Sequence, residues 1–277
     1  MPGTRAIDYG LAAFSLGIYL AFGYLLQRHE TLLVLFFYAF LFLVYTYLVF
    51  FRRGELNLNF WLIAAFVFRI SFLFSVPSLS DDIYRFIWDG RLLNAGISPY
   101  AFLPSDLLSA TGKNGLSPTL FALLNSQAYH SIYPPFAQFV FWFSTWTFPD
   151  SIVGSTAVIR LLVIAAEIGS VWMMMRLLKE WQLPPQRVMW YSLNPLVILE
   201  LTGNLHFEAF VVFFLLLTIF MLLRSKWLTA GIGMAMAVAA KLIPLMLLPL
   251  FLLRLGWRRS FIFYSVTSIV VLLIFIP

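Results

Sequence analysis

The sequence predicts an all-α membrane protein whose chain crosses the bilayer several times. Hydrophobic residues make up 62% of the 277 residues and charged residues only 11%. The mean hydropathy is +0.91. A soluble domain of this size cannot bury so much apolar surface. The apolar residues also form long runs separated by short polar stretches, which is the pattern of successive membrane-spanning helices.

Eight apolar segments carry this pattern, and a spanning helix needs roughly 20 residues to cross ~30 Å of hydrocarbon. They cover residues 7–26, 31–51, 59–77, 152–175, 188–203, 207–223, 228–253 and 260–277. The first is too long for the core of a cleaved signal peptide and lacks a small-residue cleavage site. We therefore interpret it as a retained helix.

The charges orient the chain in the membrane. With Arg5 in the cytoplasm, alternating spans bring most of the remaining Lys and Arg to cytoplasmic turns, at 52–53, 176–187, 224–226 and 254–259. The carboxylates lean to the other side, and the bias follows the positive-inside rule. A basic isoelectric point of 9.7 therefore indicates membrane orientation and not nucleic-acid binding. We therefore expect the carboxylate-rich side of the protein to face the exterior.

Two segments depart from simple alternation. Residues 77–150 become a long outer loop, and the apolar stretch 136–148 within it is short enough to form a juxtamembrane or re-entrant helix. Residues 228–253 have basic flanks on both sides and are interrupted by Lys241 and Pro244. Because proline breaks a helix, we expect two half-helices with Lys241 near the outer apex.

The start of the long loop concentrates acidic residues. After Ser80, a plausible helix N-cap, Asp82, Arg85 and Asp89 share one helical face, and Asp81 is adjacent. Carboxylates here can act as a general base or bind a divalent metal, and the spacing does not separate the two. The plainer alternative is a solvated helix end decorated with charges.

Two further stretches carry polar groups among apolar residues. Residues 129–138 contain His130, Tyr133, a double proline and Gln138, and are otherwise typical of a loop-to-helix junction. In residues 194–208, Glu200, Asn204 and Glu208 recur at i, i+4 and i+8 and share a face if the helix persists. His206 lies between them, but these residues have no recognised metal-ligand spacing.

Four ionisable residues lie at membrane depth. An ammonium such as that of Lys241 needs an anion there, and a substrate phosphate or an outer glutamate would both serve. Arg69 is a second candidate for an anionic group, or it extends outward to water. Arg160 and Glu167, seven residues apart, are expected to form a structural pair.

Taken in order, these motifs resemble GT-C fold glycosyltransferases, and among them the polyprenyl-phosphomannose-dependent mannosyltransferases, including bacterial alpha-mannosyltransferases. The resemblance covers roughly residues 60–255. It is carried by Asp82-Ile-Tyr-Arg-Phe, Asp89-Gly-Arg, Ala95-Gly-Ile-Ser-Pro-Tyr100, Pro104, Ile132-Tyr-Pro-Pro-Phe-Ala-Gln138, Asn194-Pro195, Gly203-Asn204, His206, Glu208, Ala240-Lys241 and Pro244.

The resemblance implies a GT-C-like helix bundle that moves a hexose, in this family mannose, from a polyprenyl phosphate donor. The acceptor is a hydroxyl of a glycan, lipid or protein, the transfer inverts the anomeric centre, and no metal or other cofactor is expected. The resemblance also implies the inner membrane of a bacterium, with the active site on the extracytoplasmic side. Asp82 best matches the general base and Asp81 is its neighbour. Some relatives space these acids as Asp-x-Asp, so the choice between the two stays open.

The remaining candidates take supporting roles. Lys241 and Arg69 would stabilise the departing phosphate. Contacts to acceptor or substrate are expected from Arg85, Asp89, Tyr133, Gln138, Asn204, His206 and Glu208.

The same features divide the chain into two parts. Residues 1–55 would be two additional spanning helices, and residues 56–277 the catalytic module, truncated because the sequence ends in an apolar run. Two other functions fit intramembrane charges and a broken helix: a transporter or flippase of lipid-linked sugars, and a non-catalytic scaffold in a glycan-assembly complex.

Overall fold

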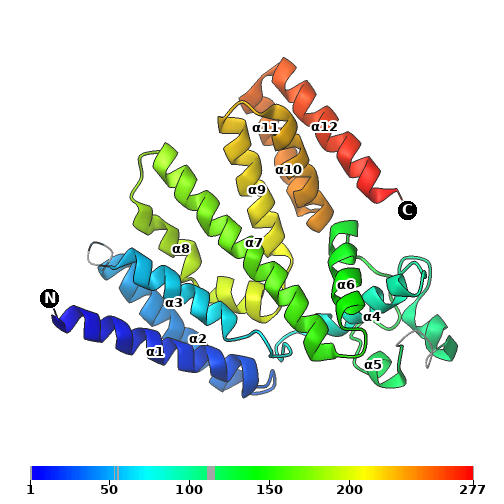
Figure 1. Cartoon of the computed structure of the whole chain (residues 1–277), viewed down its shortest axis with the longest axis horizontal. Coiled ribbons are helices and arrows are strands. Elements are labelled where there is room, and N and C mark those ends of the chain that lie inside the picture. The colour runs from blue at the N-terminus through cyan, green and yellow to red at the C-terminus, as the bar shows by residue number, and fades with distance from the viewer. Residues whose placement is uncertain (1, 53, 55, 111–115, 277) are drawn as a thin grey trace.

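The computed structural model describes residues 2–52, 54, 56–110 and 116–276. Helices account for the regular structure of these residues, and none of them lies in a β-strand. The first three helices are α1 (Pro2–Tyr24), α2 (Thr31–Thr46), which continues as a π-helical turn (Tyr47–Phe51), and α3 (Leu58–Ile70). They lie together on one flank of the molecule (Figure 1).

The long loop folds into short helices at one end of the bundle. They are α4 (Asp82–Asn94), a 3₁₀ turn (Pro104–Ala110), α5 (Pro118–Ala122) and α6 (Pro135–Thr147). The prediction of a short helix near residues 136–148 is confirmed by α6. The double proline explains where it begins, because Pro135 presets the first helical turn and gives up no intrahelical hydrogen bond.

The second half of the chain supplies the long helices. They are α7 (Ile152–Glu180), a 3₁₀ turn (Pro185–Val188), α8 (Met189–Ser192), a π-helix (Val197–Gly203), α9 (Glu208–Leu223), α10 (Trp227–Ala240), a 3₁₀ turn (Ile243–Leu247), α11 (Leu248–Leu255) and α12 (Trp257–Phe275). In Figure 1 α7 crosses the middle of the molecule, with α1–α3 on one side and α9–α12 on the other.

Four of the described helices are long and apolar enough to cross a bilayer. They are Ala6–Tyr24, Thr31–Phe51, Ile152–Glu180 and Trp257–Phe275. A fifth span is formed if Val197–Gly203 and Glu208–Leu223, which are bent by 110°, cross together. The fold is therefore that of an all-α polytopic membrane protein, and several of its other apolar segments are shorter helices.

The expected span over 59–77 is shorter in the structure, and its end has a physical cause. α3 stops at Ile70, and the backbone turns through residues 71–75. The Arg160 guanidinium takes the place of the backbone donors that a longer helix would supply here. It donates hydrogen bonds to the carbonyls of Phe72 and Ser75, both at 2.6 Å. The apolar segment 188–203 is divided between α8 and the π-helix at Asn194-Pro195, which confirms the break that this proline predicts.

The break predicted in 228–253 is confirmed. α10 ends at Ala240, and Lys241 has extended backbone with φ −160° and ψ 142°. The chain resumes as a 3₁₀ turn that contains Pro244 and then as α11. The two half-helices therefore meet at Lys241, as the sequence predicts.

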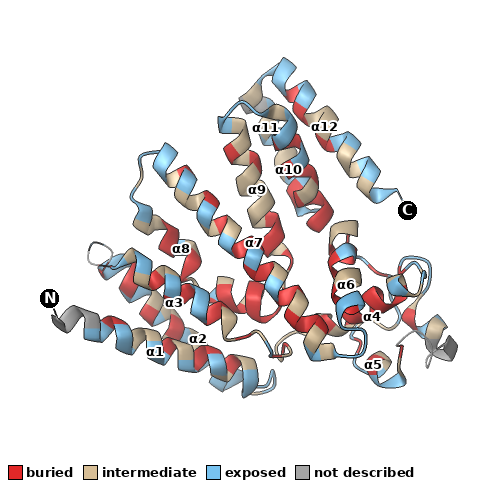
Figure 2. Cartoon of the chain, viewed as in Figure 1, coloured by how far each residue is buried: buried red, intermediate tan, exposed pale blue. Residues whose placement is uncertain are grey.

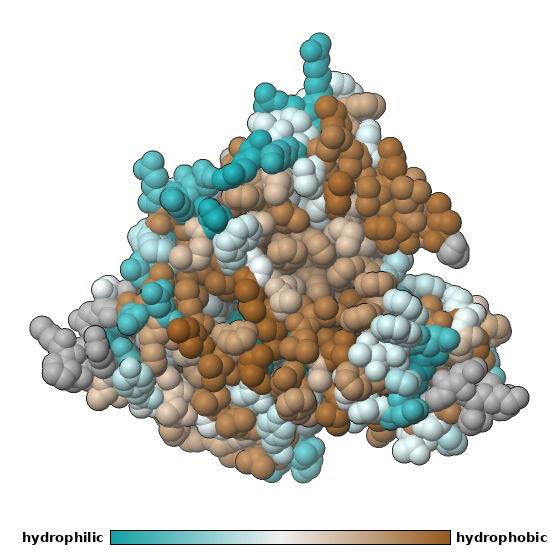
Figure 3. Space-filling model, viewed as in Figure 1, coloured by the Kyte–Doolittle hydropathy of each residue, from teal (hydrophilic) through white to brown (hydrophobic). Residues whose placement is uncertain are grey.

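Two main cores hold these elements. One joins α4, α6, α7 and the start of α9, and the other joins α1–α3 to residues 189–199. Figure 2 shows that buried residues concentrate along α7, the π-helix and the α4–α6 region. Much of the outer helical surface is apolar, and hydrophilic residues gather at the edges of the molecule (Figure 3). Exposed apolar flanks with polar ends are what a bilayer requires.

Candidate functional site

A pocket of about 410 Å³ opens where the long loop meets α9 and the end of α10. Four stretches far apart in the sequence form it. Its lining residues are Asp82, Phe86, Ile132, Tyr133, Pro134, His206, Phe207, Glu208, Ala240, Lys241, Leu242 and Ile243. The pocket therefore brings together Asp82, Tyr133, His206, Glu208 and Lys241, five of the residues that the sequence singled out.

The structure separates the two adjacent aspartates. Asp82 begins α4 and lines the pocket, and its Oδ1 accepts a hydrogen bond of 2.9 Å from Asn125 Nδ2. Asp81 is the N-cap residue instead of Ser80, and it does not line the pocket. Its carboxylate forms an exposed ion pair with Arg28, 3.5 Å apart. Of the two acids, only Asp82 lies where a substrate in the pocket would meet it.

Lys241 faces Asp82's pocket and is paired within it. Its ammonium forms a close, half-exposed ion pair with Glu208 Oε1. The alternative that Lys241 pairs with a glutamate is thus confirmed, and the side of the membrane on which the pair lies stays a prediction. The second oxygen, Oε2 of Glu208, is buried and has no hydrogen-bond partner among the residues that the structure describes. An unsatisfied buried carboxylate oxygen is costly and is an acceptor available to a ligand.

A second polar cluster stands beside the pocket, around Glu200. The helix does not persist through 200–208, so Glu200 and Asn204 separate from Glu208. Glu200 Oε2 accepts a hydrogen bond of 3.1 Å from Asn204 Nδ2 and lies 3.4 Å from His206 Nδ1. Its Oε1 accepts a hydrogen bond of 2.9 Å from the hydroxyl of Tyr38 on α2. Of the cluster, His206 lines the pocket.

An aromatic cluster underlies the pocket and fixes its walls. Phe86 of α4 stacks on Phe141 of α6 with centroids 4.4 Å apart, and both contact Phe207 edge to face. Tyr133 packs against the same rings. Burial raises the pKa of the Tyr133 hydroxyl, and the negative charges of Asp82 and Asp89 raise it further. The hydroxyl therefore stays protonated and can donate a hydrogen bond to a ligand.

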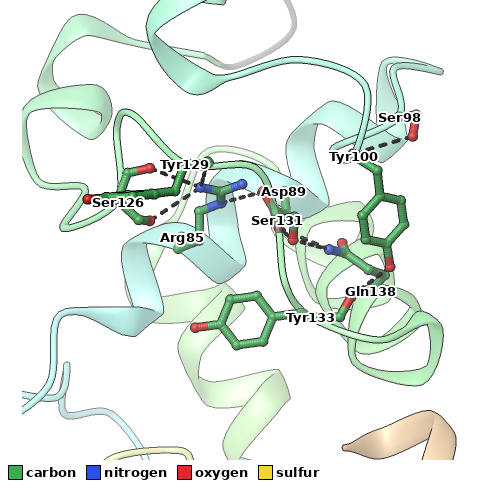
Figure 4. Close-up of polar contacts among 9 residues, drawn as sticks. All are labelled: Arg85, Asp89, Ser98, Tyr100, Ser126, Tyr129, Ser131, Tyr133 and Gln138. Carbon is green, nitrogen blue, oxygen red and sulfur yellow. Dashed lines mark hydrogen bonds and ion pairs between the residues drawn. The ribbon is translucent and has the colours of Figure 1, made fainter. Parts of the chain in front are cut away.

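Three predicted substrate contacts are placed elsewhere, in a buried network behind the pocket wall (Figure 4). Arg85 Nε donates to Asp89 Oδ1 at 2.7 Å, and Asp89 Oδ2 also accepts hydrogen bonds from Ser131 and from Gln138. Arg85 further donates to the carbonyl of Tyr129 at 2.9 Å. These side chains do not line the pocket. They tie residues 126–133 to α4, and so they hold the pocket wall.

The pKa of the Asp89 carboxyl is raised above its ordinary value because burial disfavours the charged form. The Arg85 guanidinium and the hydrogen bonds from Ser131 and Gln138 offset part of this rise. Tyr100 completes the arrangement, because its hydroxyl donates to the carbonyl of Tyr133 at 2.6 Å.

Arg69, the other predicted phosphate ligand, lies in a different cavity. It donates to Glu167 Oε1 at 2.9 Å and to the carbonyl of Ser192 at 2.8 Å, beside an apolar groove between α3 and α7. The expected pairing of Arg160 with Glu167 is wrong. Among the residues that the structure describes, Arg160 instead donates to backbone carbonyls, including those of Thr202 and Gly203. The short separation of Arg69 and Glu167 explains the difference, since the buried carboxylate already has a cation.

Comparison with known proteins decides the family. The sequence model described as "Alpha-(1->6)-mannopyranosyltransferase, N-terminal domain" matches residues 16–256. The chain belongs to this family. The match begins within α1 and extends into α11, so it includes every stretch that lines the pocket.

Two curated members of the mannopyranosyltransferase family are similar to the chain. Alpha-(1->6)-mannopyranosyltransferase A of Corynebacterium glutamicum is 21% identical over 65% of this chain and 36% of its own length. The protein of the same name from Mycobacterium tuberculosis is 28% identical over 61% of this chain and 32% of its own length. The match thus spans about a third of each relative. No solved structure matches the chain.

Some residues in and beside the pocket of this mannopyranosyltransferase family member were not found from the sequence. Asn125, which binds Asp82, and Tyr38, which binds Glu200, are single polar residues with no motif around them. Leu242 and Ile243, which line the pocket, are apolar residues in an apolar chain. Their neighbour Lys241 was singled out, so closeness to that residue was the signal that could have found them.

Proposed function

We propose that this chain binds a polyprenyl phosphate mannose and transfers the mannose to an acceptor hydroxyl, with Asp82 as general base. The observation that carries the proposal is that Asp82 and Lys241, 159 positions apart by their numbers, line the same pocket. A base and a cation on one pocket are what glycosyl transfer from a phosphate donor needs. Membership of a mannopyranosyltransferase family supports mannose as the sugar.

The proposed reaction is a single displacement. The acceptor oxygen attacks the anomeric carbon, and a carboxylate oxygen of Asp82 takes the hydroxyl proton as the new bond forms. The bond between the anomeric carbon and the phosphate oxygen breaks on the opposite face, and its electron pair leaves with the polyprenyl phosphate. Attack opposite the leaving group inverts the anomeric centre. Lys241 stabilises the negative charge that the phosphate gains.

The Lys241–Glu208 pair fits this role. Without a donor, Glu208 neutralises an ammonium that would otherwise be uncompensated near the membrane. A bound phosphate would share the ammonium with Glu208, and the unpartnered Oε2 of Glu208 would accept a hydrogen bond from a sugar hydroxyl. In this proposal the Glu208 carboxylate neutralises Lys241 when no donor phosphate is bound, and it contacts the sugar when the donor is bound.

The apolar rim supports a lipid-linked donor. Ile132 is 82% exposed and Ile243 is 53% exposed, and both line the pocket beside Leu242. A polyprenyl chain leaving the phosphate would meet these side chains before it enters the bilayer. We propose that the pocket faces the extracytoplasmic side of a bacterial plasma membrane, and that the acceptor is a glycan, lipid or protein. The reaction as proposed needs no cofactor.

The test replaces Asp82 by asparagine, which keeps the shape and the Asn125 contact but removes the base. In membranes containing the protein, transfer of mannose from radiolabelled polyprenyl phosphate mannose should fall by about 10²–10⁴-fold. The matched control is Asp81→Asn, which removes an exposed charge outside the pocket and should change the rate less than about threefold.

A second variant separates the base from the phosphate site. Lys241→Met should weaken donor binding as well as slow transfer, since it removes the cation that meets the phosphate. Normal transfer by Asp82→Asn, or a loss in Asp81→Asn as large as in Asp82→Asn, would contradict the role of Asp82. Donor translocation in liposomes without any sugar transfer would favour a flippase instead.

A further inference from the structure

Three side chains from different parts of the fold contact one another in succession, and the last of them lines the pocket. Tyr38 of α2 donates its hydroxyl to Glu200 Oε1 at 2.9 Å. Glu200 belongs to the π-helix, and its other oxygen lies 3.4 Å from His206 Nδ1. His206 lies in the turn before α9 and lines the pocket with Asp82 and Lys241. Glu200 itself does not line the pocket.

The π-helix is what brings Glu200 to His206. Val197–Gly203 is π-helical, and the chain then turns by 110° into α9. Asn204 donates to the same Glu200 oxygen, and the His206 N–H donates to the Glu200 carbonyl at 3.2 Å. The backbone N–H of His206 is therefore hydrogen-bonded to Glu200, and its imidazole lies at ion-pair distance from the carboxylate of the same residue. π-Helical turns are frequent at functional sites.

This contact selects the proton position on the imidazole. The negative charge of a carboxylate attracts an N–H hydrogen and repels a nitrogen lone pair, so the contact of 3.4 Å between Glu200 Oε2 and Nδ1 favours the tautomer with the hydrogen on Nδ1. In the neutral imidazole the other nitrogen, Nε2, is then an acceptor. A carboxylate next to one ring nitrogen of a histidine commonly determines which of the two nitrogens carries the hydrogen.

We propose that Glu200 is a positioning residue that holds His206 with Nδ1 protonated, so that Nε2 accepts a hydrogen bond from a hydroxyl of the donor's mannose. The inference rests on the proposed function. Nε2 as an acceptor does not suit an ionised phosphodiester, which offers no hydrogen. The sugar does offer hydroxyl donors, and it must lie between the phosphate at Lys241 and the base Asp82.

The test compares binding of two lipids to the detergent-solubilised protein: polyprenyl phosphate mannose and the sugar-free polyprenyl phosphate. The measured quantity is the ratio of their dissociation constants, which reports the contribution of the sugar. His206→Ala and Glu200→Gln should each shift this ratio against the mannosyl lipid by about 3–10-fold, the value of a typical hydrogen bond. Because both lipids carry the same chain, losses in tail or membrane contacts cancel.

Matched variants sharpen the result. The double variant should be no worse than His206→Ala alone, since Glu200 acts through His206. Tyr38→Phe removes one support of Glu200 and should shift the ratio in the same direction by a smaller factor. Lys241→Met should weaken both lipids and leave the ratio within about twofold of wild type. Thermal unfolding of each variant shows that it is folded, and Tyr38→Phe decides the question if Glu200→Gln does not fold.

Two outcomes separate the inference from the function on which it rests. A folded Glu200→Gln variant with the wild-type ratio overturns the positioning role of Glu200, even if His206→Ala changes the ratio. Wild-type protein that binds neither lipid overturns the proposed function itself.

Discussion

Arg160 is the residue that joins the two halves of the site region. Its guanidinium is fully buried and donates to the backbone carbonyls at the end of α3 and at the end of the π-helix, namely Phe72, Leu73, Ser75, Thr202 and Gly203. The chain continues from Phe72, Leu73 and Ser75 to Asp82, and from Thr202 and Gly203 to His206. Arg160 therefore fixes the spacing between the chain segments that enter the pocket from opposite sides.

We expect Arg160→Met to destabilise the protein by about 3–5 kcal/mol, because the substitution leaves buried carbonyls without donors. Thermal or denaturant unfolding in detergent measures the effect. The control is Arg224→Met, which removes a half-exposed ion pair with Glu180 of 2.8 Å and should cost less than about 1 kcal/mol. Equal stability of the two variants would show that the carbonyl contacts are not needed.

At the residue scale, the sequence located the polar groups but not their partners. Asp82 and Lys241 stand out because a charge in an apolar chain is costly without a use. Arg85 and Asp89 stand out for the same reason, although they pair with each other behind the wall. Helical spacing places Asp82, Arg85 and Asp89 on a common face of α4, and it does not show which end of that face opens into a pocket.

At the scale of elements, α4 and α6 approach closely enough that only glycine fits at position 90. A Cβ added to Gly90 would lie 2.3 Å from the carbonyl oxygen of Phe141 and 2.6 Å from Thr145 Oγ1. Asn94 reinforces the contact by donating to the carbonyls of Gly90 and Trp142. Asp82 begins α4, and Tyr133 lies just before α6. The distance between α4 and α6 therefore sets the width of the pocket.

We expect Gly90→Ala to destabilise the protein by about 1–3 kcal/mol and to lower transfer, since the helices must move apart. Gly17→Ala is the matched control, because a Cβ at Gly17 meets nothing within 4 Å in α1. It should be neutral or slightly stabilising. Unfolding temperatures of the two variants in the same detergent check the difference, and a neutral Gly90→Ala would refute the close packing.

Element positions were largely predictable where the sequence carried a physical signal. Pro134-Pro135 marked the start of α6, and Lys241 with Pro244 marked the end of α10. The early end of α3 was not predictable, because residues 71–77 continue the apolar run and the terminating donor, Arg160, lies on another helix. The π-helix was not predictable for the same reason, because hydropathy carries no information on a helical turn that depends on hydrogen bonds to distant parts of the chain.

At the scale of the whole molecule, the polar turns sort into two groups. The turn after α1 lies beside the start of α4 through the Arg28–Asp81 pair, and the turn after α9 lies beside the end of α7 through the Arg224–Glu180 pair. The pocket belongs to the first group. This arrangement agrees with the alternation predicted from the basic residues.

The orientation can be tested directly, because the chain contains no cysteine. We expect His130→Cys, in the exposed loop beside the pocket, to react with a membrane-impermeant maleimide on intact spheroplasts. Lys179→Cys, exposed near the end of α7, should react only after permeabilisation. The inverse pattern would place the pocket in the cytoplasm and contradict the proposed face, without excluding the chemistry.

The apolar rim of the pocket has a consequence for how a substrate is supplied. Ile132, Leu242 and Ile243 would meet acyl chains as well as a donor tail, so the prenyl lipid of the proposed function would enter by lateral diffusion within the leaflet. Occupancy then depends on the mole fraction of donor among the surrounding lipids and not on its amount per volume of water. Dilution of a membrane suspension leaves that fraction, and hence the loading of the enzyme, unchanged.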